Sequence, residues 1–132
     1  MDAPLPPVSH RDLLDRPLFT HMGTVRSDGA PLVNPMWFEY DAAANRILLT
    51  HTKTRHNYRY LKAEPRVALS ITDPEDQYRY LQVRGEVESE EDDPTGAFYQ
   101  RLQQRYRGYS SEVKDRAVRV RLTVRPVAWK VR

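Results

Sequence analysis

The chain has 132 residues, of which 39% are hydrophobic and 30% charged, so its composition fits one globular domain and excludes a disordered chain. The net charge of +3, from 21 basic and 18 acidic residues, is too small to indicate a nucleic-acid-binding protein by itself. No cysteine is present, which excludes disulfides, thiolate catalysis and cysteine-ligated zinc, and no apolar run reaches the length of a membrane span.

The N-terminal third predicts a loose arm, a short helix and a β-hairpin. Residues 1–8 contain three prolines and lack the pattern of a signal peptide, so we expect a cytoplasmic protein. Ser9 is expected to cap a helix over residues 10–15. Strands are predicted over residues 18–26 and 31–40, joined by a tight turn at residues 27–29.

A basic helix is the most informative stretch of the middle part. A strand over residues 46–50 leads into a predicted helix over residues 54–62, which Pro65 ends. Four cations gather at the start and along one face of this helix: Lys53, Arg55, Arg59 and Lys62. The helix dipole favours anions at its start, so cations there indicate a bound anion such as a phosphate. A solvated basic face is the alternative interpretation.

The C-terminal half predicts more strands and a second helix. One face of the strand over residues 77–88 is aromatic and polar together, which is unusual for a solvated sheet face. An acidic connector is expected over residues 88–93, followed by a helix that begins at Asp93-Pro94 and ends at Gly108. The buried stripe of this helix is predicted at Phe98, Leu102 and Tyr106. The remaining strands are predicted over residues 66–72, 116–125 and 127–132, the last two separated by Pro126.

Six or seven strands, joined mostly by hairpins, predict a mainly β fold. Antiparallel strands of this number close best as a barrel with helices over its openings, and a β-sandwich is the weaker alternative. Pro35, inside the strand over residues 31–40, favours a sheet edge or a bulge, because proline cannot donate to the ladder. We expect one domain over residues 1–132.

The residues favour a site for a planar ligand with a phosphate tail. Glycine-rich phosphate loops and standard catalytic motifs are absent, and the four histidines lack the spacing of metal ligands, so we expect no metal. The ring would lie along residues 34–37, and the phosphate would meet Thr50, Thr52 and the basic helix. Trp37 and its aromatic neighbours are alternatively simple core residues.

Four segments of the chain resemble the pyridoxamine 5′-phosphate oxidase-like superfamily of flavin and deazaflavin oxidoreductases. These segments are residues 23–31, 33–41, 64–69 and 73–85. Their pattern is most similar to the branch that uses coenzyme F420. The resemblance implies an antiparallel split β-barrel with flanking helices, usually a homodimer with two cofactor sites at the interface. It further implies hydride transfer between reduced F420 and an electron-poor conjugated small molecule.

The resemblance also implies which residues bind the cofactor. The family usually carries Arg-x-Lys-x-Arg-Asn after the third strand; here Arg55 and Arg59 match, whereas Asn57 and Tyr60 depart from the pattern and Lys53 is a substitute cation. The full candidate set is Asn34, Pro35, Met36, Trp37, Thr50, His51, Thr52, Lys53, Arg55, Asn57, Arg59 and Tyr80. His51 and Tyr80 are polar candidates near the ring, and no catalytic residue is assigned.

Three alternatives stay open at this point. Flavin mononucleotide (FMN) shares the phosphate end of F420, so an FMN-dependent oxidase or reductase fits the basic helix equally well. A cofactor-binding protein without its own substrate is the second alternative. A basic nucleic-acid-binding barrel is the third, and the small net charge argues against it. We expect neither a nucleic-acid nor a membrane partner.

Overall fold

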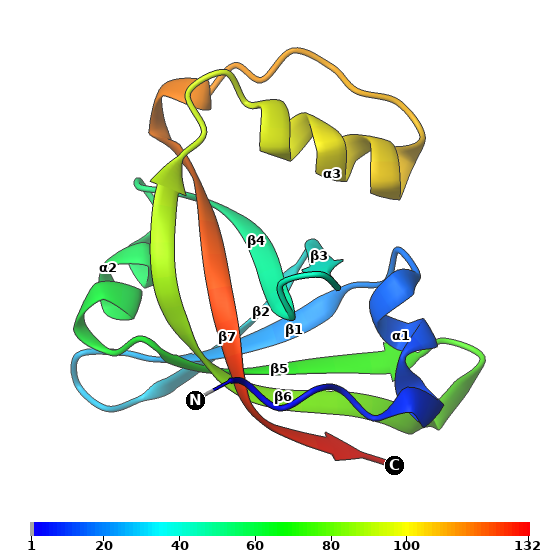
Figure 1. The fold of residues 1–132 in the computed structure, drawn as a ribbon. Coiled ribbons are helices and arrows are strands. Elements are labelled where there is room, and N and C mark those ends of the chain that lie inside the picture. Colours follow the sequence, from blue (N-terminus) through cyan, green and yellow to red (C-terminus); the bar gives the residue numbers. More distant parts are fainter. Residues whose placement is uncertain (1) are drawn as a thin grey trace.

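Seven antiparallel strands form one sheet that curls into a half-barrel (Figure 1), which confirms the mainly β split barrel expected from the sequence. The computed structural model describes residues 2–132, except for the side chains of residues 56 and 57. The strand order is β2-β1-β5-β6-β7-β4-β3. The strands are β1 (Thr20–Val25), β2 (Pro31–Met36), β3 (Phe38–Asp41), β4 (Arg46–Thr52), β5 (Arg66–Asp73), β6 (Asp76–Asp92) and β7 (Arg119–Val131).

The helices lie around the rim of the sheet. They are the 3-10 turn η1 (Val8–His10), α1 (Asp12–Asp15), α2 (His56–Ala63), α3 (Ala97–Arg107) and the 3-10 turn η2 (Arg116–Val118). In Figure 1, α3 lies above the upper end of the sheet, while α1 lies close to β5 and β6. The predicted turn between β1 and β2 is confirmed, with Gly29 at φ 86° and a backbone bond from Arg26 N to the Ala30 carbonyl.

The prediction of a single strand over residues 31–40 is wrong, because the strand is interrupted at Trp37. Before the break, β2 pairs only with β1; after it, β3 pairs with β4 at the opposite end of the strand order. Pro35 lies on the edge strand β2, as its missing N–H requires. This break in the strand therefore places β2 at one edge of the half-barrel and β3 at the other.

The acidic segment over residues 88–93 is not a connector, because β6 continues to Asp92 and pairs with β7 throughout. Its carboxylates are paired with cations from other parts of the chain, which offset their negative charge. The pairs are Glu88 with Arg46, Glu90 with Lys62, Glu91 with Arg121 and Asp92 with Lys53.

Pro126 does not end a strand either, because β7 runs without interruption from Arg119 to Val131. The register shifts here: Gly85 faces Pro126, and Arg84 faces Ala128, so Val127 is the extra residue of a bulge. A bulge leaves a backbone position outside the ladder, and this is where a strand accepts proline.

Helix boundaries also differ from the predicted ones. The first helix is split into η1 and α1, and the Ser9 hydroxyl contacts the His10 ring instead of capping. The second begins at His56, so Lys53 and Arg55 precede it. The third begins at Ala97, three positions after the expected proline, yet the Asp93 carboxylate still accepts bonds from the N–H groups of Phe98 and Tyr99.

The sheet carries apolar contacts on both faces. The main core fills the inside of the half-barrel and includes Leu13, Met22, Leu69 and Leu122. A smaller core on the other face consists of Leu48, Phe98 and Leu102, with Trp37 and Tyr106 packed against it. The second core attaches α3 to the end of β4, and the candidate site lies along this junction.

The N-terminal segment, expected as a loose arm, has no regular secondary structure up to Val8. Its backbone carbonyls nevertheless accept bonds from the body of the protein. Asn45 donates to the carbonyls of Ala3 and Pro4, and the Trp129 indole donates to the Pro4 carbonyl at 2.8 Å.

Candidate cofactor site

A cavity of about 180 Å³ lies between the end of β4, the β2–β3 break and α3. Half of the twelve predicted site residues line it, although they come from three separate parts of the sequence. These six residues are Pro35, Met36, Trp37, Thr50, His51 and Arg55. The structure therefore brings together the strand predicted to border the ring and the strand end predicted to meet the phosphate.

Three further residues line this cavity and were not predicted: Phe19, Tyr99 and Arg119. Phe19 lies just before β1, Tyr99 is on α3, and Arg119 begins β7. The sequence contained one usable signal for Tyr99, since this residue comes directly after Phe98, a residue of the predicted buried stripe of α3. Nothing local indicates that α3 docks beside Trp37, because that contact joins segments about sixty residues apart along the chain.

Aromatic rings build one wall of the cavity. Trp37 stacks on Tyr106 with 4.8 Å between ring centroids and 4° between ring planes, and it meets Tyr99 edge to face at 6.1 Å. The Tyr106 hydroxyl accepts a bond from Phe38 N at 3.0 Å and donates to the Leu18 carbonyl at 2.6 Å. These contacts fix the break between β2 and β3, and with it the position of the indole.

Arg119 contributes a half-buried cation. Its guanidinium lies 3.7 Å from the centroid of the Tyr99 ring and donates through Nη1 to the Thr50 hydroxyl at 3.2 Å. Nε and Nη2 donate to the two carboxylate oxygens of Asp115 at 2.8 and 3.1 Å. The arginine is therefore held on three sides before any ligand enters.

His51 lines the same cavity and is 2% exposed. The Thr52 backbone N–H donates to its Nδ1 at 2.9 Å, so the neutral ring carries its proton on Nε2. The Tyr58 ring meets the imidazole edge to face at 6.2 Å. The backbone and α2 together therefore fix both the tautomer and the orientation of the ring.

The start of α2 is open toward an anion. Among the side chains that the structure describes, none caps this end, and no acidic residue lies in the first turn, so its backbone N–H groups keep their attraction for a negative charge. Arg55, the residue before the helix, is exposed, and among the described residues none pairs with its guanidinium. Lys53 differs, since its ammonium lies 2.8 Å from Asp92, a contact that raises the pKa of Lys53.

The other predicted residues lie outside this cavity. Asn34 is on β2 opposite Met22, and Tyr80 is on β6 opposite Thr72. Thr52 is buried and accepts a bond from the Thr54 hydroxyl. Lys53 and Arg59 are exposed beside and on α2, and the Asn57 side chain falls outside the described residues.

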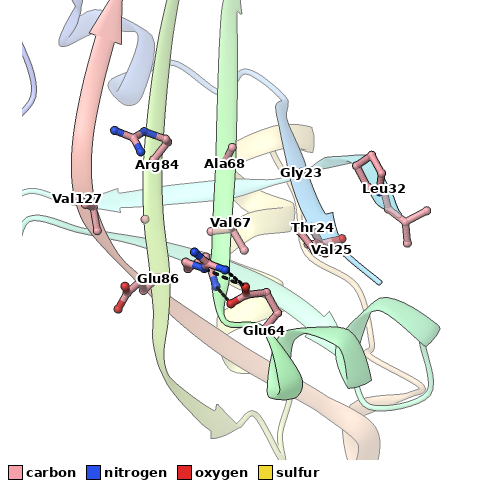
Figure 2. Close-up of a pocket in the computed structure, with 13 residues that line it drawn as sticks. Gly23, Thr24, Val25, Leu32, Glu64, Val67, Ala68, Arg84, Glu86 and Val127 are labelled. Atoms are coloured by element: carbon pink, nitrogen blue, oxygen red, sulfur yellow. Dashed lines mark hydrogen bonds and ion pairs between the residues drawn. The ribbon is translucent and has the colours of Figure 1, made fainter. Parts of the chain in front are cut away.

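A larger cavity, of about 430 Å³, contains none of the predicted residues. It crosses five strands, and Figure 2 shows Gly23 of β1, Ala68 of β5, Arg84 of β6 and Val127 of β7 along it. Its lining is mostly apolar and lacks the aromatic wall and the open helix start found at the smaller cavity. Size alone therefore does not make it the candidate cofactor site.

Comparisons with known proteins found a matching family and similar solved structures. The family model described as pyridoxamine 5′-phosphate oxidase matches residues 8–131. A solved structure named F420 Reductase is 50% identical, with a TM-score of 0.89, over 94% of this chain and 98% of that one. A comparison with curated proteins gave no match.

Two more distant structures share the fold. A putative pyridoxamine 5′-phosphate oxidase from Listeria innocua is 15% identical with a TM-score of 0.72, over 93% of this chain and 94% of that one. A conserved hypothetical protein from Mycobacterium tuberculosis is 17% identical with a TM-score of 0.76, over 98% of this chain and 86% of that one.

None of the helices within the described residues combines the length and the apolar character needed to cross a bilayer. The split barrel and a family match over almost the whole sequence lead to one assignment. The chain belongs to the pyridoxamine 5′-phosphate oxidase family.

Proposed function

We propose that this protein is an oxidoreductase that uses reduced coenzyme F420 to transfer a hydride to an electron-poor conjugated small molecule. The convergence of six predicted cofactor residues around one cavity carries this proposal. The relative at 50% identity named F420 Reductase supports the deazaflavin over FMN. The family supports the broader class, an oxidoreductase of the flavin or F420 type.

The residues present fit such a cofactor. The Trp37 indole and its aromatic neighbours provide a flat apolar wall for a ring, and the Thr50 hydroxyl lies at the strand end beside it. Arg55 and the open start of α2 suit the phosphate. The bound deazaflavin would supply the hydride chemistry, while these residues bind it, orient it and exclude water.

We further propose that each site is completed by a second copy of the chain. The cavity of about 180 Å³ is smaller than the roughly 300–1,000 Å³ typical of small-molecule sites. A tricyclic ring with its tail therefore needs another wall. A homodimer with a cofactor site at the interface supplies this wall, and it also covers the aromatic and polar face of β6.

The proposal is tested by titrating the purified protein with F420 and, separately, with FMN. Fluorescence measures the binding of each cofactor. We expect preferential binding of F420 and a loss of affinity of roughly 10- to 100-fold in Arg55→Gln, which is the worth of a charge-assisted hydrogen bond. Arg26→Gln is the matched control, since Arg26 is an exposed hairpin arginine that pairs with Asp28 at 3.4 Å. Its affinity should equal that of the wild type.

The outcomes separate the alternatives. Preferential binding of FMN would replace the cofactor assignment and keep the enzyme class. Tight F420 binding without oxidation of the reduced form by enoates or quinones would favour a cofactor-binding protein without its own substrate. Binding of neither cofactor would contradict the proposed function.

A further inference from the structure

Arg119 is a second arginine of the cofactor cavity, and its environment differs from that of Arg55. Its side chain is 11% exposed, whereas Arg55 is exposed at the start of α2. Asp115, Thr50 and Tyr99 hold the guanidinium from three sides. An arginine fixed in this way is prepared to present its remaining donors in one direction.

The donor count shows what Arg119 is able to bind. A guanidinium has five N–H groups, and bonds to described residues use three of them, one each from Nε, Nη1 and Nη2. The Nε and Nη2 fork, which would grip a phosphate with two parallel bonds, is already occupied by Asp115. One N–H on Nη1 and one on Nη2 remain, which suits a single ligand oxygen.

The charge balance points the same way. The Asp115 carboxylate offsets the positive charge of Arg119, so the cofactor phosphate gains little from it, while Arg55 and the start of α2 keep their attraction for that group. A carbonyl oxygen that becomes negative during a reaction gains more, because the N–H groups are already in place when the charge forms.

We propose that Arg119 binds the carbonyl oxygen of a conjugated acceptor substrate and stabilises the oxyanion that forms on it during reduction. This inference rests on the proposed function. In the reaction, the bound deazaflavin would be the two-electron reductant, and its hydride would form a C–H bond at the carbon β to the carbonyl. The π pair of the C=C bond would form a new C=C bond to the carbonyl carbon, and the π pair of the C=O bond would move onto the oxygen. Water would then protonate the resulting enolate at the α carbon, and the hydroxide left behind would take up the proton released when the cofactor is oxidised.

The inference predicts the effect of Arg119→Gln on catalysis. Loss of one preorganised oxyanion donor typically lowers kcat by about 100- to 1,000-fold. We expect a loss of this order with a conjugated enone or quinone, with F420 affinity unchanged and partial recovery in Arg119→Lys. Arg116→Gln is the matched control, because it removes an arginine three positions away whose partners, the Val113 carbonyl at 3.3 Å and the Glu112 carboxylate at 3.9 Å, do not line the cavity.

A binding experiment separates this role from a merely structural one. The probe is para-nitrophenol, a planar oxyanion mimic whose phenolate form is coloured, titrated with the F420-loaded protein. Binding to the wild type and to Arg116→Gln should lower the apparent pKa of the phenol. In Arg119→Gln the shift should disappear, with a loss of phenolate affinity of about tenfold or more.

Two results would overturn the inference. The first is an equal phenol pKa shift in the wild type and in Arg119→Gln, or no shift in either. The second is loss of F420 binding itself in Arg119→Gln, which would assign Arg119 to the cofactor. Failure of the wild type to bind F420 is a different result, seen before any variant is tested, and it would contradict the proposed function.

Discussion

Tyr106 stabilises the β2–β3 break with its ring and its hydroxyl together. The ring stacks on Trp37, and the hydroxyl satisfies Phe38 N and the Leu18 carbonyl. Burial raises the pKa of Tyr106, so the hydroxyl keeps its proton and its donor function over the physiological range. One side chain of α3 thus determines where the indole wall of the cavity lies.

We expect Tyr106→Phe to keep the stacking and to lower the free energy of unfolding by about 1–3 kcal/mol, because Phe38 N–H loses its partner in a part-buried place. F420 affinity should fall as well, since the β2–β3 break beside Trp37 loses the hydrogen bond that fixes it. Urea unfolding and the fluorescence titration measure the two effects. Tyr109→Phe, at a tyrosine that is 61% exposed, should change neither.

Single residues also show how far sequence reasoning reaches. The apolar stripe of α3 was predicted, because its period is local and belongs to the helix itself. Arg105 was not predicted, although it donates to the carbonyls of Leu14, Asp15, Arg16 and Phe38. Its partners lie on α1, on the turn after it and on β3, so only the folded chain brings them within reach.

At the scale of elements, α1 depends on ion pairs for its stability. It has four residues, far fewer than an isolated helix needs. Arg79 of β6 donates to the Asp12 carboxylate at 2.6 and 3.0 Å, to Asp73 at 3.0 Å and to the Ser9 carbonyl at 2.8 Å. The arginine thereby joins the N-terminal helix to the β5–β6 hairpin.

This network predicts a pH dependence of stability. Bonds from Arg79 lower the pKa of Asp12, and backbone and arginine bonds lower that of Asp73. A carboxylate with a lowered folded-state pKa stabilises the protein above its unfolded pKa of about 3.9, and this stabilisation is lost as the pH falls through the folded value. Arg79→Met should therefore be less stable than the wild type near pH 7, and the gap should narrow below about pH 4.

Thermal unfolding across this pH range measures the gap. Arg26→Met is the control, since its partner Asp28 is exposed on the β1–β2 turn. A constant difference between Arg79→Met and the wild type at all pH values would show that packing of the arginine, and not its charge, holds α1.

Helices and strands were predicted well where the local sequence pattern determines their bounds. They were predicted poorly where pairing with distant segments determines them. The β1–β2 hairpin and the alternating strand β5 follow from turn residues and period two. The length of β6 does not follow from such a local pattern, because its acidic end is stabilised by cations from α2, β4 and β7. The break at Trp37 was missed for the same reason, since its two halves pair with different strands.

At the scale of the whole molecule, the outer face of the half-barrel offers a surface for a second copy of the chain. Val67 and Leu69 of β5 point into the core, so Ala68 between them points outward, where it lines the larger cavity (Figure 2). Nearby, Val33 is 67% exposed and Val127 43% exposed. Small and apolar residues on neighbouring strands, with Arg84 and Glu86 among them, line a hollow that suits contact with a second copy.

Ala68→Asp tests this surface, because a charge at its centre is costly to bury against a partner. If the proposed homodimer uses this face, the variant should sediment as a monomer where the wild type sediments as a dimer, and its F420 affinity should fall because the cavity loses its second wall. Ala43→Asp, in the exposed turn between β3 and β4, adds the same charge elsewhere and should leave both unchanged. A variant that stays dimeric with full F420 affinity would exclude this face as the interface, whereas a wild-type monomer that binds F420 tightly would show that one chain builds the whole site.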